Sequence, residues 1–223
     1  MWTVSRKFKR NQAGYTLIEL MIGILVGLIV VSGVSVAFLA VLRSSSNLVN
    51  STALNTEVGS TLDIMVGEIR RAGYVSGAIS STNPYVLQSI ADISTPTVTP
   101  ADSCLLYSYD VGENGPSLST ASLKGFKLSG TQILMRQAAS SVTSSASNSC
   151  SDGTWGSLTS DRVSVETLTF DLSCEAGDGS ACTNSGVNIR WVDITLVAKS
   201  GNDPDVRTTI SERVKVQNNV DFD

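Results

Sequence analysis

The side chain with the clearest chemical interest near the start of the chain is Glu19, a carboxylate at the edge of a long uncharged stretch. The 23 residues from Leu20 to Leu42 carry no charge. As a helix they would cover roughly 34 Å, enough to cross a bilayer. A carboxylate in hydrocarbon costs on the order of a few kcal/mol, so it needs a partner or a function. Snorkelling of Glu19 to the headgroups is the alternative that needs neither.

The segment ahead of Glu19, residues 1–14, is a basic leader. It contains four basic side chains and no acidic one: Arg6, Lys7, Lys9 and Arg10. A basic flank stays in the cytoplasm while the rest of the chain is translocated. Three interpretations fit: a signal peptide cut near 35–37, a plain membrane anchor, and cleavage directly after Gly14. The apolar run is too long for the first, and the second gives Glu19 no function.

The motif Gly14-Tyr15-Thr16-Leu17-Ile18-Glu19 resembles the prepilin-peptidase site of type IV pilins and of type II secretion pseudopilins. The resemblance implies leader cleavage between Gly14 and Tyr15 and N-methylation of Tyr15. It also implies that Glu19 pairs with the positively charged amino terminus of a neighbouring subunit, and a buried charge is tolerated when it is paired in this way. Phenylalanine is commoner in the family where Tyr15 stands, and both are aromatic.

Three later segments narrow the resemblance to the PilW-type minor pilins, to which pseudopilin J of type II secretion is related. They are "IRRAGY" (69–74), "CLLYSYDVGENG" (104–115) and "ERVKVQNN" (212–219). The resemblance implies a low-copy subunit that primes pilus assembly. Its partners would be other minor and major pilins, the prepilin peptidase and the inner-membrane assembly platform.

The same resemblance implies a location. The protein would be a single-pass protein among inner-membrane lipids, with its carboxy-terminal domain in the periplasm, before it joins a pilus at the cell surface. Two alternatives stay open: a type II secretion pseudopilin, and a membrane-anchored periplasmic binding module that keeps its leader.

Composition bounds the other function classes. Removing four leader bases from 16 Lys+Arg leaves 12 against 20 Asp+Glu, a formal net charge of −8. A chain this acidic has no general attraction for nucleic acid, so no nucleic-acid partner is predicted. The chain has no histidine and none of the common catalytic motifs. We therefore expect neither enzymatic activity nor a cofactor.

The four cysteines predict disulfides in an exported domain. They are Cys104, Cys150, Cys174 and Cys182. Three connectivities are possible. Cys174 and Cys182 enclose a short, turn-prone stretch, which favours a local bridge between them and leaves Cys104 to pair with Cys150. The spacings do not resemble paired CxxC metal sites.

Two further groups of residues are weaker candidates. Asp110, Glu113 and Asn114 offer oxygen ligands around glycines, but a full calcium loop is lacking and a turn is the favoured interpretation. Gly23 and Gly27 form a small-xxx-small pattern that suits close helix packing in a membrane.

The elements that must position these residues begin with one long helix, predicted from about Thr16 to Ala72. Residues 15–43 would form its transmembrane and assembly half. Residues 44–73 carry an apolar stripe at three- and four-residue spacing and would form its amphipathic half. Arg70 and Arg71 suit the last turn, and Gly73 suits a left-handed stop.

Residues 74–223 would form a β-rich globular domain. Strands are predicted at 104–110, 123–128, 132–137, 162–174, 188–200 and 206–217. Loops are expected at 76–102 and 140–156, a hairpin turn at 200–205, and a bulge between Val165 and Leu168. Glu212 shares an apolar face of the last strand, so it either pairs with an arginine or lies where that face meets solvent. The fold class is α+β and pilin-like: one long helix packed on a mainly antiparallel sheet.

Overall fold

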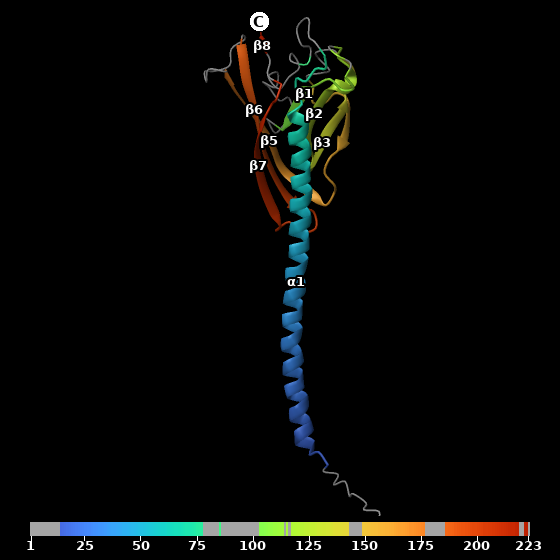
Figure 1. Cartoon of the computed structure of the whole chain (residues 1–223). Coiled ribbons are helices and arrows are strands. Elements are labelled where there is room, and N and C mark those ends of the chain that lie inside the picture. Colours follow the sequence, from blue (N-terminus) through green and yellow to red (C-terminus); the bar gives the residue numbers. More distant parts are fainter. Residues whose placement is uncertain are drawn as a thin grey trace, which may run out of the picture. The chain divides into compact units, whose positions relative to one another are not determined.

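The computed structural model describes residues 14–77, 85, 103–113, 115, 117–142, 149–176, 186–218 and 221–222. The chain divides into two compact units, one ending at Ser46 and the other beginning at Asn47. A single helix, α1 (Leu17–Ile69), makes up most of the described first unit and continues into the second (Figure 1). The fold is α+β and pilin-like, as the sequence predicts: a long amino-terminal helix and antiparallel strands.

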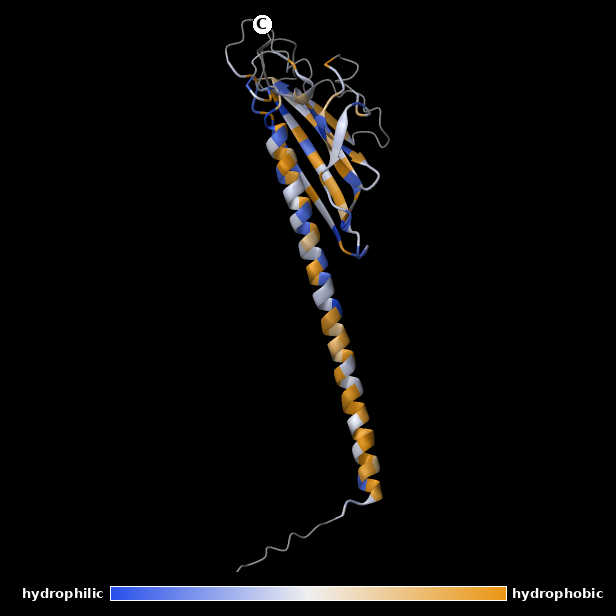
Figure 2. Cartoon of the chain, turned by 90° about the vertical axis from the view of Figure 1, so that its right-hand side faces the viewer, coloured by the Kyte–Doolittle hydropathy of each residue, from blue (hydrophilic) through white to orange (hydrophobic). Residues whose placement is uncertain are grey.

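In the first unit, α1 is apolar on all sides. Its large side chains between Leu17 and Leu42 are exposed, and Figure 2 shows this half as mostly hydrophobic, with paler bands between the orange ones. The helix is long and apolar enough to cross a membrane. An apolar surface of this length is stable in lipid and not in water, so we describe this half as a membrane anchor.

In the second unit, α1 buries one face only. The buried side chains recur every three or four residues, which places them on one stripe: Leu54, Val58, Thr61, Leu62, Met65 and Ile69. This stripe packs against apolar side chains from both sheets in one core. The predicted amphipathic half is therefore a core helix of the domain on one side and exposed on the other.

Two antiparallel sheets complete the second unit. The first has the order β1-β2-β3-β4, with β1 (Cys104–Ser108), β2 (Leu123–Ser129), β3 (Gln132–Ala138) and β4 (Thr154–Ser157). The second has the order β5-β6-β7, with β8 paired to β6; these are β5 (Val163–Ala176), β6 (Gly186–Ser200), β7 (Arg207–Lys215) and β8 (Asp221–Phe222). A short 3₁₀ turn, η2 (Thr120–Ser122), precedes β2. Figure 1 shows the sheets to either side of the second half of α1.

The predicted single sheet is thus two sheets. Alternation along a strand says which face is buried, but it does not say which strands become neighbours. Strand β4 begins within the predicted loop 140–156 and ends one residue beyond it, and β8 was not predicted at all. The first strand also ends at Ser108 rather than at residue 110. The predicted loop 76–102 lies almost entirely outside the described residues.

Three local predictions for the second sheet are confirmed. The pairing of β5 with β6 shifts register between Val165 and Thr167, which is the predicted bulge. The turn after Ser200 joins β6 and β7 as a hairpin. Glu212 is exposed although Val214 and Val216 on the same face are buried. Of the two alternatives for Glu212, the solvent-exposed one is therefore correct.

The helix ends at Ile69, three residues before the predicted end at Ala72. Beyond Ile69 the N–H groups of Arg71 and Ala72 bond three residues back, at 3.1 and 3.0 Å, which is a tighter turn than an α-helix. Arg70 and Arg71 therefore follow the helix instead of forming its last turn. Gly73 has a φ of 78°, the left-handed stop that the sequence predicts.

Groups from the end of β1 and from the segment after β7 pair with the polar groups at this helix end. The N–H of Gly73 donates to the carbonyl of Ser108, the last residue of β1, over 2.8 Å. The N–H of Gln217 and the side-chain amide of Asn218, which follow β7, donate to the carbonyls of residues 70–72 over 3.1–3.3 Å. Helix ends leave their last carbonyls unpaired, and here the chain after β7 supplies the donors.

We predict that Asn218→Ala lowers the free energy of unfolding by about 1 kcal/mol, because two carbonyls at the helix end lose their side-chain donor. The measurement is denaturant unfolding of the purified chain in detergent. Asn202→Ala is the control; Asn202 lies in the exposed hairpin turn, and its loss should change stability by less than about 0.5 kcal/mol. Equal effects of the two substitutions would contradict the capping role.

Candidate functional site

The candidate site at the amino terminus begins with a short non-helical segment. Residues 14–16 precede α1 and are exposed, Tyr15 to 85%. The first helical hydrogen bond runs from the N–H of Leu20 to the carbonyl of Thr16 over 3.3 Å. The N–H of Glu19 donates to the Thr16 hydroxyl over 3.4 Å, so Thr16 caps the helix. Gly14 and Tyr15, the two residues of the predicted cleavage site, therefore lie just outside the helix.

The part of the fold that the structure describes does not require glycine at position 14. A Cβ built on Gly14 meets no atom within 4 Å in the described structure. Its φ also lies outside the left-handed region that only glycine adopts easily. A glycine is needed when another backbone or side chain approaches closely, and here no such group comes from the described part of the chain.

Glu19 and the candidate packing glycines lie on one row of the helix. Glu19, Gly23 and Gly27 are four residues apart, and side chains at this spacing line up along an α-helix. A shallow groove of about 420 Å³ runs beside Tyr15, Glu19 and Gly23. Like Gly14, both glycines have open space where a Cβ would stand. This row of the helix thus carries one carboxylate, followed by two positions without side chains, where the helix surface is low.

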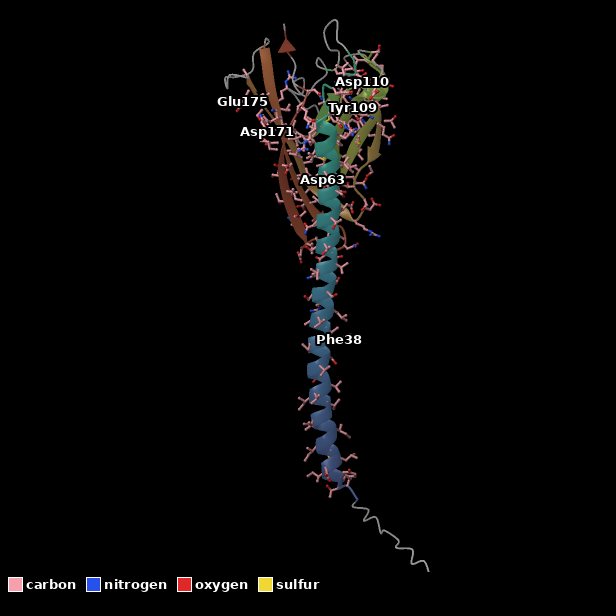
Figure 3. The ribbon with its side chains drawn as sticks, viewed as in Figure 1. Phe38, Asp63, Tyr109, Asp110, Asp171 and Glu175 are labelled. Atoms are coloured by element: carbon pink, nitrogen blue, oxygen red, sulfur yellow. A yellow bond between two sulfur atoms is a disulfide. The ribbon has the colours of Figure 1, made fainter. Side chains whose placement is uncertain are left out.

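A second cluster of polar groups lies where α1 ends. The Tyr109 hydroxyl donates to Glu68 Oε2 over 2.8 Å, and Arg71 pairs with Glu68 Oε1 over 3.2 Å. Figure 3 shows Tyr109 beside the end of the helix. Burial and the neighbouring Glu68 carboxylate raise the pKa of Tyr109 to about 12. Tyr109 is therefore a hydrogen-bond donor at neutral pH and holds the helix to the segment after β1.

Asp110, the first residue of the weak calcium candidate, has a structural role. Its Oδ2 atom accepts hydrogen bonds from the N–H and hydroxyl of Ser76, at 3.2 and 2.5 Å, and from the N–H of Gly115, at 3.0 Å. Glu113 is exposed in a left-handed turn with a φ of 56°. Asn114 lies outside the described residues. Among the described residues, no three acidic, cysteine or histidine side chains form a group that could hold a metal.

Two family models match the chain. The prokaryotic N-terminal methylation motif matches residues 9–35, which include the exposed Gly14–Tyr15 segment and Glu19. A second model, prepilin peptidase-dependent protein B, matches residues 47–216, more than half of the 223 residues. The chain belongs to the prepilin peptidase-dependent protein B family. No curated protein and no solved structure matches it.

Membership of this family agrees with the geometry at the amino terminus. A prepilin peptidase-dependent protein is a substrate of that peptidase, and the chain carries the type IV pilin-like motif directly before a membrane-length helix. The family match and the motif match cover separate parts of the chain, the domain and the anchor. The protein is thus a membrane-anchored, pilin-like protein of the prepilin peptidase-dependent class.

The predicted cysteine pairing is confirmed for the long loop. Cys104 and Cys150 form a disulfide between β1 and the segment before β4. Both are buried and pack with Leu106 against Trp155. Cys182 and the side chain of Cys174 lie outside what the structure describes, so the second bridge stays a prediction.

Trp155 is half-buried beneath cationic side chains rather than freely exposed. The Lys127 ammonium lies 4.1 Å from the centre of its ring, and Lys127 also donates to the carbonyl of Cys150 over 2.8 Å. The indole N–H donates to the carbonyl of Asp152 over 2.8 Å. These contacts give Trp155 a packing role in the domain.

Sequence reasoning missed three polar side chains that join elements of the domain. Glu57 on α1 accepts hydrogen bonds from the N–H and hydroxyl of Ser160, at 2.6 and 3.0 Å. Glu68 binds Tyr109 as described above. Arg136, only 1% exposed, donates through Nε to the carbonyl of Leu123 over 3.0 Å. The two glutamates each precede a buried residue of the helical stripe, which is the only signal in the sequence that could have found them.

We predict that the melting temperature of the Tyr109→Phe variant falls less steeply than that of the wild type as the pH rises above 10. Because the folded pKa of Tyr109 is about 12 and the unfolded value about 10, its contribution is complete below pH 10 and is lost as the pH rises toward 12. The measurement is the melting temperature between pH 8 and pH 12. The Phe variant should melt lower at pH 8 and show a shallower decline. An identical decline in both proteins would contradict the assignment.

We predict that replacing both Cys104 and Cys150 with serine lowers the free energy of unfolding by about 3 kcal/mol, because the unfolded chain gains the freedom of a long open loop. Denaturant unfolding under oxidising conditions measures the change. The double replacement of Cys174 and Cys182, which leaves this bridge intact, is the comparison. If the Cys104/Cys150 variant unfolded at the wild-type midpoint, the predicted stabilisation by this disulfide would be wrong.

Proposed function

We propose that the chain is a minor pilin of the PilW type, which helps to prime and join a type IV pilus. The observation that carries the filament-subunit part of the proposal is the segment at residues 14–19, whereas the PilW-type assignment is based on the resemblance of residues 69–74, 104–115 and 212–219. It combines an exposed, non-helical Gly14–Tyr15 bond, a glycine whose Cβ position meets no described atom of the chain, and Glu19 at the start of a membrane-length apolar helix. A peptidase that accepts only a residue without a side chain ahead of the cut explains that glycine.

Cleavage after Gly14 creates a charged amine at Tyr15, which is then N-methylated. Glu19 of one subunit pairs with the amine of another as their helices pack together, since a charge in an apolar environment is stabilised mainly by an opposite charge. The low relief at Gly23 and Gly27 lets a neighbouring helix approach closely. The apolar first half of α1 lies in lipid before assembly and against other helices afterwards.

The polar side chains of the domain described above have structural roles. Its polar clusters at Glu57, Glu68 and Asp110 are occupied by hydrogen bonds that join the elements of the fold. The proposed partners are other minor and major pilins, the prepilin peptidase and the assembly platform of the inner membrane. The domain faces the periplasm, where the Cys104–Cys150 bridge forms. A type II secretion pseudopilin would share every one of these features, so the experiments below compare pili with secretion.

We predict that Gly14→Ser blocks leader removal, because the peptidase then meets a side chain where its site accepts none. The substitution leaves the fold unchanged, since a Cβ at position 14 has open space. Intact mass of the protein from membranes of its host measures the outcome: the wild-type chain begins at Tyr15 with an added methyl group, and the variant begins at Met1. A variant processed as fast as the wild type would contradict peptidase recognition of Gly14.

We predict that Glu19→Ala and Glu19→Gln are cleaved normally but enter filaments at least tenfold less often, a factor that corresponds to about 1.4 kcal/mol of lost pairing. The measurement is the amount of the subunit in sheared pili, alongside secretion of exported proteins by the same cells. Asp63→Asn is the matched control; Asp63 is an exposed acid on α1 of the second unit. A loss of pili alone supports the minor pilin, and a loss of secretion alone supports the pseudopilin. Normal assembly of both Glu19 variants would rule out the charge pair.

A further inference from the structure

We propose that Thr16 is a positioning residue for leader cleavage. Its hydroxyl caps the amino-terminal end of α1, and only Tyr15 separates Thr16 from Gly14 on the other side of the scissile bond. The inference rests on the proposed cleavage after Gly14. It concerns the state of the backbone that the peptidase meets, and it assigns to Thr16 a role separate from those of Gly14 and Glu19.

One amide hydrogen bond marks the start of the helix. In a helix that continued toward the amino terminus, the N–H of Glu19 would donate to the carbonyl of Tyr15. Here the same N–H donates to the Thr16 hydroxyl over 3.4 Å, and the first helical carbonyl is that of Thr16. The side chain of Thr16 thus takes up the donor that would otherwise extend the helix by one residue.

The consequence falls on the scissile bond. In the described part of the chain, neither the Gly14 nor the Tyr15 carbonyl accepts a hydrogen bond. Gly14 and Tyr15 are both exposed and non-helical. Hydrolysis requires that a nucleophile and an oxyanion donor reach the Gly14 carbonyl, and a helical carbonyl is already engaged by a backbone N–H four residues on. In an extended helix that N–H would be the one of Ile18.

A lipid environment strengthens this dependence. At a membrane surface the free N–H groups of a helix end are costly when they lack a partner, so a helix without its cap gains by continuing to the next carbonyls. Alanine at position 16 also has a higher helix propensity than threonine. Loss of the hydroxyl therefore releases the Glu19 N–H to the Tyr15 carbonyl, which makes residue 16 helical. Once the helix has been extended by this residue, its next bond runs from the Ile18 N–H to the Gly14 carbonyl.

The test compares three full-length precursors with the wild type: Thr16→Ala, Thr16→Val and Thr16→Ser. Each is made in host cells with the peptidase repressed, and cleavage in isolated membranes is followed by intact mass after the peptidase is supplied. Alanine and valine should slow cleavage about fivefold, the factor that corresponds to one lost side-chain cap. Serine should cleave at close to the wild-type rate because it keeps the hydroxyl. Thr52→Ala, which removes a hydroxyl bonded within the middle of α1, should cleave normally.

A second readout separates positioning from direct recognition of the Thr16 side chain by the peptidase. Amide hydrogen exchange of the uncleaved precursors in detergent should show new protection at Ile18 in the alanine variant and none in the serine variant. Three results would overturn the proposal: wild-type cleavage of the alanine variant, slow cleavage of the serine variant, or slow cleavage of alanine without new protection at Ile18. A wild-type precursor that is never cleaved would instead refute the proposed function itself.

Discussion

The end of α1 is the constraint on which the described domain depends. A helix of 53 residues must stop, and its last carbonyls need donors that the helix cannot supply. Gly73 turns the chain and donates to β1 of the first sheet, while Gln217 and Asn218 bring donors from the end of β7 in the second sheet. The first and last parts of the domain therefore meet at the helix end, and the two sheets are fixed to it together.

Apolar burial and polar contacts have different roles along the second half of the helix. The buried stripe supplies most of the stabilisation, at roughly 1.5–3 kcal/mol for each large side chain. That attraction is not directional, so it leaves the helix free to slide or rotate by small amounts. Glu57 and Glu68 remove this freedom, because each carboxylate accepts hydrogen bonds from a fixed donor in the β-rich part, Ser160 and Tyr109 respectively. The fold is held by its stripe and aligned by its two glutamates.

Sequence patterns predicted the features that depend on one element alone. The length of the uncharged stretch predicted the membrane half of the helix, the spacing of apolar residues predicted its buried stripe, and Gly73 predicted where it stops. Strand alternation gave most strands, the bulge near Val165 and the hairpin after Ser200. The division into two sheets could not be predicted, because it depends on pairing between segments far apart in the chain. Strand β4 was missed because it is short and exists through its pairing with β3 beside the disulfide of Cys150.

For the candidate site, the sequence supplied the residue types and the structure supplied their surroundings. Gly14, Tyr15 and Glu19 were found from the resemblance of residues 14–19 to the prepilin-peptidase motif, but the capping role of Thr16 needs the position of a hydroxyl and an amide. Asp110 was singled out as a possible cation ligand, and its oxygen proved to accept bonds from Ser76 and Gly115. A carboxylate beside glycines has the same appearance in a sequence whether it binds a metal or closes a turn. Only its neighbours decide between the two.

The open space around Gly14, Gly23 and Gly27 has a consequence for how this protein is studied. Because no described atom of the chain lies where their side chains would grow, substitutions there cause no clash within the chain. The change in helix propensity at positions 23 and 27, up to about 1 kcal/mol, falls in the anchor half of α1 and not in the domain. A library of variants sorted by thermal stability would reveal the domain in detail and remain blind to these positions. Substitutions at these positions change contacts with other molecules, so their effects are measured only in assays that include those molecules.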